Sequence, residues 1–232
     1  LPPPDGLFRD WIDAYASSGE APDEMHMAAA VALASTAIGW RAWIGWGESL
    51  EPVTVNVVLT GTSATARKTT TANIARRVAQ LATQGDSDPA LHVRDITHTS
   101  SRELLELVAP DGQSQAQEWE KNPPPGHLLV WDEIGSILGK PGDTKGADWT
   151  GQTRSTIMQF TGGRHGGIQL GSAQRPAGRC AVSVLGTMTR AELEQRVTHG
   201  LITDGFMGRM LLVPYGARSR YLAVPEKMSG NQ

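Results

Sequence analysis

The chain has 232 residues, of which 39% are hydrophobic and 19% charged, and its formal net charge is −3. This composition is that of a globular protein; it excludes a disordered chain and an overall basic coat, so any contact with nucleic acid must be local. The single cysteine, Cys180, excludes an internal disulfide framework, and we interpret it as a small buried residue in a protein of the reducing cytoplasm. The most apolar stretch, 27–39, is too short to span a bilayer, so we expect no membrane association.

Residues 1–52 predict an N-terminal helical extension. The chain opens with a proline-rich segment and no methionine, which indicates a fragment of a longer protein with further domains. Apolar residues at helical spacing predict one helix over 8–16 and a second over about 22–38. His26, in the first turn of the second helix, has no partner at metal-ligand spacing, so we interpret it as a surface or core histidine.

Three tryptophans follow these helices, interleaved with glycines: Trp40, Trp43 and Trp46. Stacking on nucleic-acid bases is one interpretation of such a cluster. We favour the other, a packed cap over the edge of a sheet.

From residue 53 to 216 the pattern alternates between strand and helix, and 217–232 reads as a C-terminal tail. The apolar runs predict strands over 53–60, 91–96, 127–131, 180–186 and 210–214, and helices over 70–81, 104–108 and 190–197. Ser100 and Glu103 fit a capping box before the second of these helices. Strands separated by helical crossovers predict an α/β fold with a mainly parallel five-stranded sheet, right-handed crossovers and helices on both faces.

The stretch 55–71 reads VNVVLTGTSATARKTTT, a buried strand, a loop of small residues and a helix beginning at Lys68 and Thr69. Backbone N–H groups of such a loop can bind phosphate, Lys68 adds a positive charge, and the Thr69 hydroxyl can hold Mg²⁺. The candidate nucleotide-binding residues are Gly61, Thr62, Ser63, Ala64, Thr65, Ala66, Arg67, Lys68, Thr69 and Thr70.

The match to the phosphate-loop pattern GxxxxGK[ST] is loose. The two glycine positions fall on Thr62 and Arg67, and the one glycine of the loop, Gly61, lies a residue early. Arg67 must therefore either point away from a bound nucleotide or contact it, and we expect it to point away. Taken alone, the stretch is compatible with a nucleotide site and with a plain strand–loop–helix turn.

A second signal lies at the end of the strand over 127–131, where Asp132 and Glu133 follow the apolar run. This is the form of a Walker B motif, in which Asp132 would hold Mg²⁺ and Glu133 would orient and deprotonate the attacking water. An acidic pair that merely ends a strand is the alternative. Both motifs fall at the carboxyl ends of strands, where open α/β sheets bind ligands. One predicted strand–helix unit, the strand over 91–96 and the helix over 104–108, lies between the two motifs in the chain. An intervening strand is the arrangement of the additional-strand P-loop NTPases.

Two further residues complete the candidate site. Thr187, at the end of the strand over 180–186, is a candidate sensor of the γ-phosphate or the water, although a threonine that simply ends a strand fits equally well. Arg209, just before the last strand, is a candidate arginine finger for a neighbouring subunit, against the alternative of a solvated surface side chain.

The segment 149–180 lacks acidic residues and carries a local positive charge, contributed by Arg154, Arg164, His165, Arg175 and Arg179. Within it, residues 161–170 resemble a flexible turn or hairpin tip. Such a loop could grip the phosphates of nucleic acid, and the alternative is an ordinary glycine-rich hairpin.

Taken in order, these motifs resemble the P-loop ATPase domain of phage, plasmid and mobile-element primase–helicase proteins, long catalogued as a domain of unknown function. The matching stretches are 59–70, 97–105, 128–138 and 204–213. The resemblance implies a RecA/AAA+-like core, ATP and Mg²⁺ as ligands, and assembly into a homo-oligomeric ring, a hexamer among the options. The departure is Ala64, where relatives usually carry glycine, which puts catalytic efficiency in doubt more than fold.

The hypothesis is therefore an ATP-hydrolysing motor that acts on single-stranded or forked DNA, with Lys68, Glu133, Thr187 and Arg209 in catalysis. The alternative is an ATP-binding assembly or regulatory module with little turnover. A small-molecule kinase is a third class, which is weakened because no arginine-rich lid segment is recognisable in the sequence.

Overall fold

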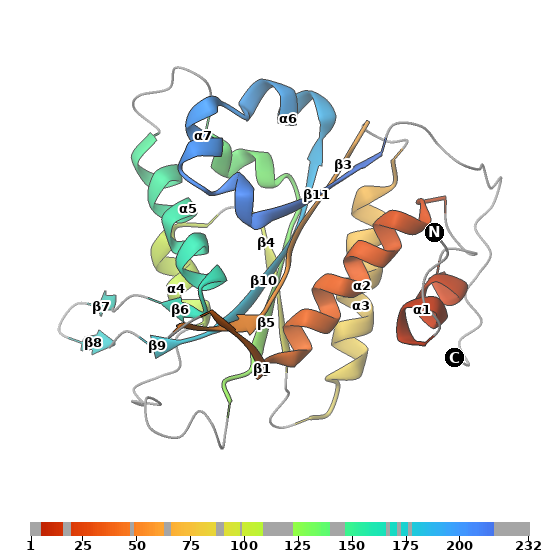
Figure 1. Ribbon diagram of the computed structural model, residues 1–232, viewed down its shortest axis with the longest axis horizontal. Helices are drawn as coiled ribbons and strands as arrows, with labels where there is room; N and C mark the ends of the chain where they lie inside the picture. The colour runs from red at the N-terminus through yellow and green to blue at the C-terminus, as the bar shows by residue number, and fades with distance from the viewer. Residues whose placement is uncertain are drawn as a thin grey trace.

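The computed structural model describes residues 6–15, 20–46, 49–62, 66–86, 91–97, 99–108, 123–139, 147–165, 168–170, 173–175 and 178–215. Its centre is a five-stranded sheet in the order β11 (Met210–Tyr215), β3 (Asn56–Gly61), β10 (Ala181–Thr189), β5 (Gly126–Trp131) and β4 (Leu91–Ile96). Every neighbouring pair in this sheet is parallel (Figure 1). The predicted α/β fold with a five-stranded parallel sheet is confirmed.

Helices cover both faces of the sheet (Figure 1). One face carries α1 (Leu7–Tyr15), α2 (Asp23–Ile38) and α3 (Lys68–Ala82). The other carries α4 (Ser101–Val108), η2 (Ile134–Leu138), α5 (Ala147–Thr161), α6 (Arg190–Arg196) and α7 (His199–Thr203), with η3 (Met207–Arg209) leading into β11. The side chains of β3 alternate between the two cores: Val57 and Leu59 pack with α2 and α3, and Val58 packs on the opposite side. The central strands are thus buried on both faces, which explains their continuous apolar runs.

Helix α2 is an integral layer of this core. Gly126 at the start of β5 allows the approach, because a Cβ there would lie 2.0 Å from the carbonyl oxygen of Thr36. The Ser35 and Ser183 hydroxyl groups lie 3.3 Å apart across the contact between α2 and β10. The division expected near residue 52 therefore separates elements that share one hydrophobic core. His26 is fully buried in α2, which agrees with the core interpretation of this residue.

The region before β3 differs from the prediction of one strand over 53–60. Val53 ends β2 (Ser49–Val53), which pairs antiparallel with β1 (Gly39–Trp46), and the central strand begins only at Asn56. A tryptophan cap is only partly present: Trp40 is buried and donates its indole N–H to the Cys180 carbonyl at 2.9 Å, whereas Trp43 is 47% exposed. The Trp46 side chain lies outside the described part of the structure. The β-branched run hid the break because a hairpin strand and a buried strand favour the same residues.

Between the strands predicted over 127–131 and 180–186, no helix was predicted, but the structure has the 15-residue helix α5 there, followed by a hairpin. The hairpin pairs β6 (Arg164–His165) with β9 (Gly178–Arg179), and β7 (Ile168–Leu170) with β8 (Ala173–Arg175). Of residues 161–170, those that the structure describes are the end of α5, a turn at 162 and 163, and strands on one arm of the hairpin, so the predicted turn is present but is not the hairpin tip. Figure 1 shows β7 and β8 at the far side of α5 from the sheet.

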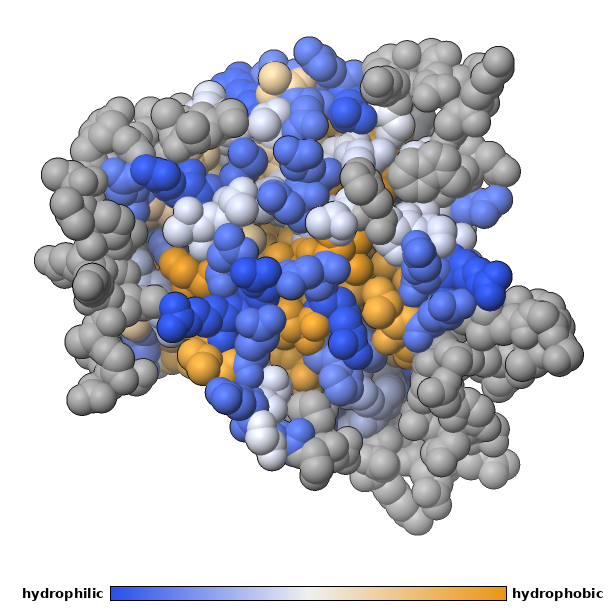
Figure 2. Space-filling model, turned by 180° about the vertical axis from the view of Figure 1, so that it is seen from behind, coloured by the Kyte–Doolittle hydropathy of each residue, from blue (hydrophilic) through white to orange (hydrophobic). Residues whose placement is uncertain are grey.

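The capping box predicted before α4 is present: the Ser100 N–H donates to Glu103 Oε2 at 2.7 Å, and the Glu103 N–H donates to the Ser100 hydroxyl at 3.3 Å. The pKa of Glu103 is lowered by the hydrogen bonds that its carboxylate accepts from the Ser100 N–H and from the Ser100 and Thr99 hydroxyl groups. Among the described residues, no helix is long and apolar enough to cross a membrane. Seen from behind, apolar patches on the surface are interrupted by hydrophilic side chains (Figure 2).

Candidate functional site

Three side chains from distant parts of the sequence meet at the carboxyl edge of the sheet. Asp132 Oδ1 accepts a hydrogen bond from the Thr187 hydroxyl at 2.5 Å and another from the Thr69 hydroxyl at 3.3 Å. Thr69 is in the first turn of α3, Asp132 follows β5, and Thr187 belongs to β10. The fold thus brings together Thr69, Asp132 and Thr187, for which the sequence predicted contact with the metal ion or the γ-phosphate.

The register of the sheet explains this meeting. In β10, Gly186 is level with Trp131 of β5 and Thr187 is level with Leu59 of β3. The polar side chain at 187 therefore stands one position beyond the end of β5, beside Asp132. Thr187 is 1% exposed, whereas Asp132 is exposed, so a buried hydroxyl supports a carboxylate that faces solvent.

Glu133 has an unusual backbone conformation. Its φ of 57° and ψ of 50° place it in the left-handed region, which costs a non-glycine residue roughly 1–2 kcal/mol. Its N–H donates to the Thr187 hydroxyl at 3.3 Å, so Thr187 holds both members of the acidic pair. The Glu133 side chain is exposed at the start of η2. Residues held in this region without glycine often lie at functional sites.

The loop between β3 and α3 folds back onto the strand end. Ala66 is fully buried and its N–H donates to the Thr62 carbonyl at 3.3 Å. A Cβ on Gly61 would lie 2.5 Å from the Ala66 side chain, so the one glycine of the loop is needed for this packing. Ser63, Ala64 and Thr65 lie outside the described residues.

The structure also shows what Arg67 does. Its φ of 50° and ψ of 24° are left-handed, the conformation for which glycine is the default, and glycine is the residue that the phosphate-loop pattern has at this position. Its guanidinium binds Glu20 through Nε and Nη2, each 2.7 Å from Oε2. We expected Arg67 to point away from a bound nucleotide; in the structure its guanidinium is directed to Glu20. Glu20 was missed, because no pattern links two residues 47 positions apart.

The N-terminus of α3 is suited to bind an anion. Its first turn has no acidic residue, and the side chain of its N-cap residue, Arg67, makes no capping hydrogen bond. The first N–H groups of a helix lack intrahelical partners and carry partial positive charge. Lys68 is half-buried at this position, and Thr69 and Thr70 are exposed.

The oxygen ligands present fit a magnesium ion shared with phosphate groups. Mg²⁺ is usually bound by one or two protein carboxylates, with water and substrate phosphates completing its shell. The Thr69 hydroxyl and the Asp132 carboxylate provide such a pair. Among the described residues, no group of three or more His, Cys, Asp or Glu side chains is arranged to hold a metal ion without a ligand.

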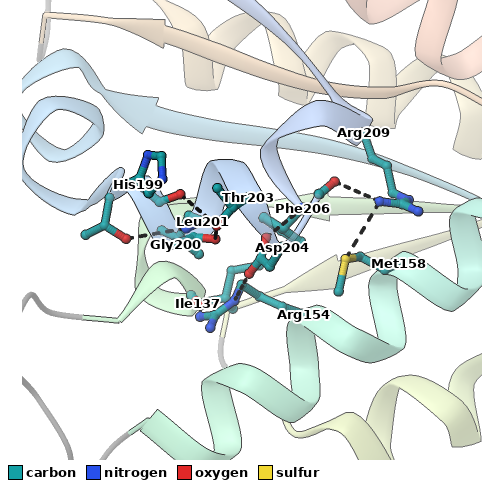
Figure 3. A network of polar contacts seen from close by, with 12 residues as sticks. Ile137, Arg154, Met158, His199, Gly200, Leu201, Thr203, Asp204, Phe206 and Arg209 are labelled. Atoms are coloured by element: carbon teal, nitrogen blue, oxygen red, sulfur yellow. Dashed lines mark hydrogen bonds and ion pairs between the residues drawn. The ribbon is translucent and has the colours of Figure 1, made fainter.

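Arg209 lies at the opposite end of the sheet. Met210 pairs with Asn56 at the start of β3, whereas Gly61 at its other end pairs with Tyr215. The five-residue step between these pairs corresponds to roughly 16 Å along a strand. The Arg209 guanidinium donates to the Gly205 carbonyl at 2.8 Å and lies 4.0 Å from Met158 Sδ (Figure 3). The structure therefore does not bring Arg209 to Asp132 of the same chain.

The basic residues of 149–180 have different surroundings. Arg154 is mostly buried; it donates to the Ile137 carbonyl at 2.8 Å and lies 4.0 Å from Asp204 (Figure 3). Arg179 stacks on Trp40 with 4.7 Å between the guanidinium and the ring centre. Arg164 is exposed in β6, directly opposite Arg179. The side chains of His165 and Arg175 lie outside the described part.

Three other titratable groups are buried: Cys180 and His127 near the starts of β10 and β5, and His26 in the first turn of α2. Burial raises the pKa of the Cys180 thiol far above its usual range, which agrees with the interpretation of a buried residue that is not a nucleophile. Burial lowers the pKa of His26 to about 4 and that of His127 to about 3, with the nearby charges of His92 and Arg94 adding to the shift of His127. Both imidazoles are therefore neutral at pH 7.

These features define an α/β protein with a parallel five-stranded sheet, compatible with Rossmann- and RecA-like folds, whose candidate site lies at the carboxyl edge of β3, β10 and β5. A scan of protein-family models gave no match to the chain, and a search of curated proteins found no significant similarity.

Proposed function

We propose that the chain is an ATP-hydrolysing motor domain of the P-loop class that acts on DNA during replication of a phage or mobile element. The observation that carries the proposal is the meeting of Thr69, Asp132 and Thr187 around one carboxylate oxygen. The position of β10 between β3 and β5 adds support, because an intervening strand is the arrangement of the additional-strand P-loop NTPases.

Each residue of the site has a role in this proposal. Lys68 and the first N–H groups of α3 bind the β- and γ-phosphates, and Thr69 and Asp132 hold Mg²⁺, which supplies charge neutralisation when bound. Glu133 orients the attacking water and accepts its proton. Thr187 fixes Asp132 and the Glu133 backbone, and this position lets it respond to the γ-phosphate.

The partners follow from features outside this edge. Arg164, exposed on the hairpin, contacts the phosphates of single-stranded or forked DNA together with His165. Arg209, at the opposite end of the sheet from Asp132, serves the site of a neighbouring subunit in a homo-oligomeric ring, with six subunits as one option. We further propose that the ring works in the cytoplasm, linked to other domains such as a primase.

One observation favours a second candidate, an ATP-binding assembly or regulatory module with little turnover. The glycine position before Lys68 is occupied by Arg67, and Gly61 is used for packing against Ala66. Such a loop could bind nucleotide yet align it poorly for hydrolysis.

The test measures ATP binding, phosphate release and particle mass together, with and without Mg²⁺ and single-stranded DNA. The motor predicts Mg²⁺-dependent hydrolysis that DNA stimulates, and replacement of Lys68 by Ala should abolish it. The matched control is Arg77→Ala, because Arg77 is an exposed cation on the same helix, two turns from the site.

The outcomes separate the candidates. Tight ATP binding without phosphate release in any assembled state would favour the module. Absence of both binding and hydrolysis would overturn the nucleotide site. Transfer of the phosphoryl group to a metabolite instead of water would make the protein a small-molecule kinase.

A further inference from the structure

The residue before Lys68, Arg67, has a backbone conformation that is unfavourable for a residue other than glycine. Arg67 and Glu133 are the two non-glycine residues with positive φ in the described part of the chain. Arg67 also precedes the helix whose first N–H groups would face a ligand. For an L-residue the left-handed conformation costs roughly 1–2 kcal/mol, so neighbouring contacts must hold it.

The contact that holds Arg67 comes from the connection between α1 and α2. Glu20 is 9% exposed, and its Oε2 accepts from both Nε and Nη2 of Arg67. The Arg67 side chain remains 44% exposed, so the carboxylate is the buried partner of the pair. Two charge-assisted hydrogen bonds of 2.7 Å fix the direction of the guanidinium.

Both ends of this contact are anchored. Glu20 precedes Ala21, which is buried, and Pro22, whose carbonyl accepts from Met25 and His26 in the first turn of α2. On the other side, the Arg67 carbonyl accepts from both the N–H and the hydroxyl of Thr71, which is fully buried in α3. The Arg67 backbone is therefore fixed between a buried helix turn and the connection before α2.

We propose that Glu20 is a positioning residue of the phosphate site, and that its pairing with Arg67 replaces the glycine of the standard loop. The pair holds residue 67 in the left-handed conformation and so directs the first N–H groups of α3 and Lys68 toward the nucleotide phosphates. This inference rests on the proposed function. It also links the nucleotide loop to the N-terminal helices, so a change in their packing would change nucleotide affinity.

The proposal predicts that the effect of Glu20 depends on which residue stands at 67. Glu20→Gln keeps the shape of the side chain and removes its charge, whereas Arg67→Gly restores a residue that adopts the left-handed conformation without support. We expect E20Q to weaken binding of a fluorescent ATP analogue about tenfold, equivalent to about 1.4 kcal/mol. In the R67G background, E20Q should have no further effect.

A second measurement follows the backbone conformation at residue 67 in the protein without nucleotide. The Thr71 amide is bonded to the Arg67 carbonyl at 3.1 Å, so its hydrogen exchange in the free protein reports on this turn. E20Q should accelerate this exchange about tenfold in the Arg67 protein and should not accelerate it in the R67G background. The matched control is Asp95→Asn, which removes the exposed ion pair between Asp95 and Arg76 of the same helix and should leave the exchange of Thr71 unchanged.

The two measurements separate the inference from the proposed function. Suppose that E20Q accelerates hydrogen exchange of the Thr71 amide only when Arg67 is present, and that the chain binds no ATP. Glu20 would then position residue 67, but the proposed nucleotide site would be wrong. Equal effects of E20Q in both backgrounds, in exchange or in affinity, would overturn the inference and show that Glu20 only stabilises the fold. Nucleotide binding that is lost in K68A but is indifferent to E20Q would also overturn it, while leaving the proposed function intact.

Discussion

Thr187 donates its hydroxyl hydrogen to Asp132 and accepts the backbone N–H of Glu133, so one buried side chain joins β10 to both carboxylates that follow β5. The geometry uses the hydroxyl as donor and acceptor at once. Valine has nearly the same shape but neither capacity. The position is therefore one at which a nearly isosteric change should separate a role in the site from a role in packing.

Replacing Thr187 by Val should lower ATP turnover roughly 10- to 100-fold, because Asp132 and Glu133 would lose their common support. The free energy of unfolding should fall by only about 1 kcal/mol, since Asp132 is exposed and remains hydrated. Single-turnover hydrolysis and denaturant unfolding measure the two effects. The control is Thr156→Val, which removes a buried hydroxyl bonded to Gln152 in α5 and should change stability alone. Equal turnover in the two variants would contradict the role of Thr187.

The backbone at Glu133 leads to a second prediction. Both Glu133→Ala and Glu133→Gly remove the carboxylate and should reduce hydrolysis by about 100-fold or more, the usual effect of losing a general base. They should differ in stability, because alanine keeps the strain at φ 57° and glycine relieves it. We expect the glycine variant to unfold with a free energy about 1 kcal/mol higher than the alanine variant. Equal stability would mean that the left-handed conformation is not maintained in solution.

The sequence predicted the central strands well because β3, β5 and β10 are buried on both faces and read as continuous apolar runs. The edge strand β4, which is partly exposed, also matches the predicted 91–96 residue for residue. It failed where the same signal has two meanings. The β-branched residues at 53–60 belong to two strands. Helix α5 was missed because its threonines, serine and glycine are weak helix formers, a preference that the packing of Ile157 and Phe160 overrides.

The candidate site could be predicted only in part. Lys68 and Thr69 begin a helix, Asp132 follows a strand and Thr187 lies near the end of one, so a parallel topology places them at one edge. Glu20 has no such marker: its partner is 47 residues away, and the pairing depends on how the connection before α2 approaches the loop. The sequence also did not predict the internal contacts of Arg154 and Arg179. No sequence pattern distinguishes an arginine that faces solvent from one that stacks on a tryptophan or binds a backbone carbonyl.

The buried histidines predict how stability depends on pH. His26 is fully buried, and within the described part of the chain neither ring nitrogen has a hydrogen-bond partner. Its folded pKa is about 4 against 6.5 for the free side chain, since burial outweighs the opposing charge of Asp23. Above pH 6.5 the imidazole is neutral in both states and has no effect. As the pH falls from 6.5 to 4, the unfolded state takes up the proton first, so the free energy of unfolding should drop by an amount on the order of 3 kcal/mol.

Denaturant unfolding between pH 8 and 4 measures this effect. His26→Leu should remove most of the loss between pH 6.5 and 4, and the remaining slope should reflect His127, whose folded pKa is about 3. The control is His199→Gln, because His199 is exposed and should leave the slope unchanged. A slope that H26L does not alter would show that the His26 imidazole is hydrated in solution.

The hairpin from β6 to β9 carries the last prediction, that Arg164 and His165 contact DNA phosphates. Changing both to Ala should weaken binding of single-stranded DNA and reduce the steepness of its salt dependence by about one per lost phosphate contact, while ATP affinity stays the same. Stability should be unaffected, because Arg164 is exposed. Fluorescence anisotropy over a range of salt concentrations measures the slope.

Two arginines outside the hairpin, Arg190 and Arg154, serve as controls for the loss of positive charge in the Arg164 and His165 variant. Arg190→Ala removes an exposed cation on α6 that pairs with Glu194, and it should not alter the slope. Arg154→Ala should lower stability without changing the slope, since Arg154 donates to the Ile137 carbonyl and is mostly buried. If the Arg164 and His165 variant keeps the full salt dependence, the hairpin is not the DNA-binding surface, whatever the net charge of the segment.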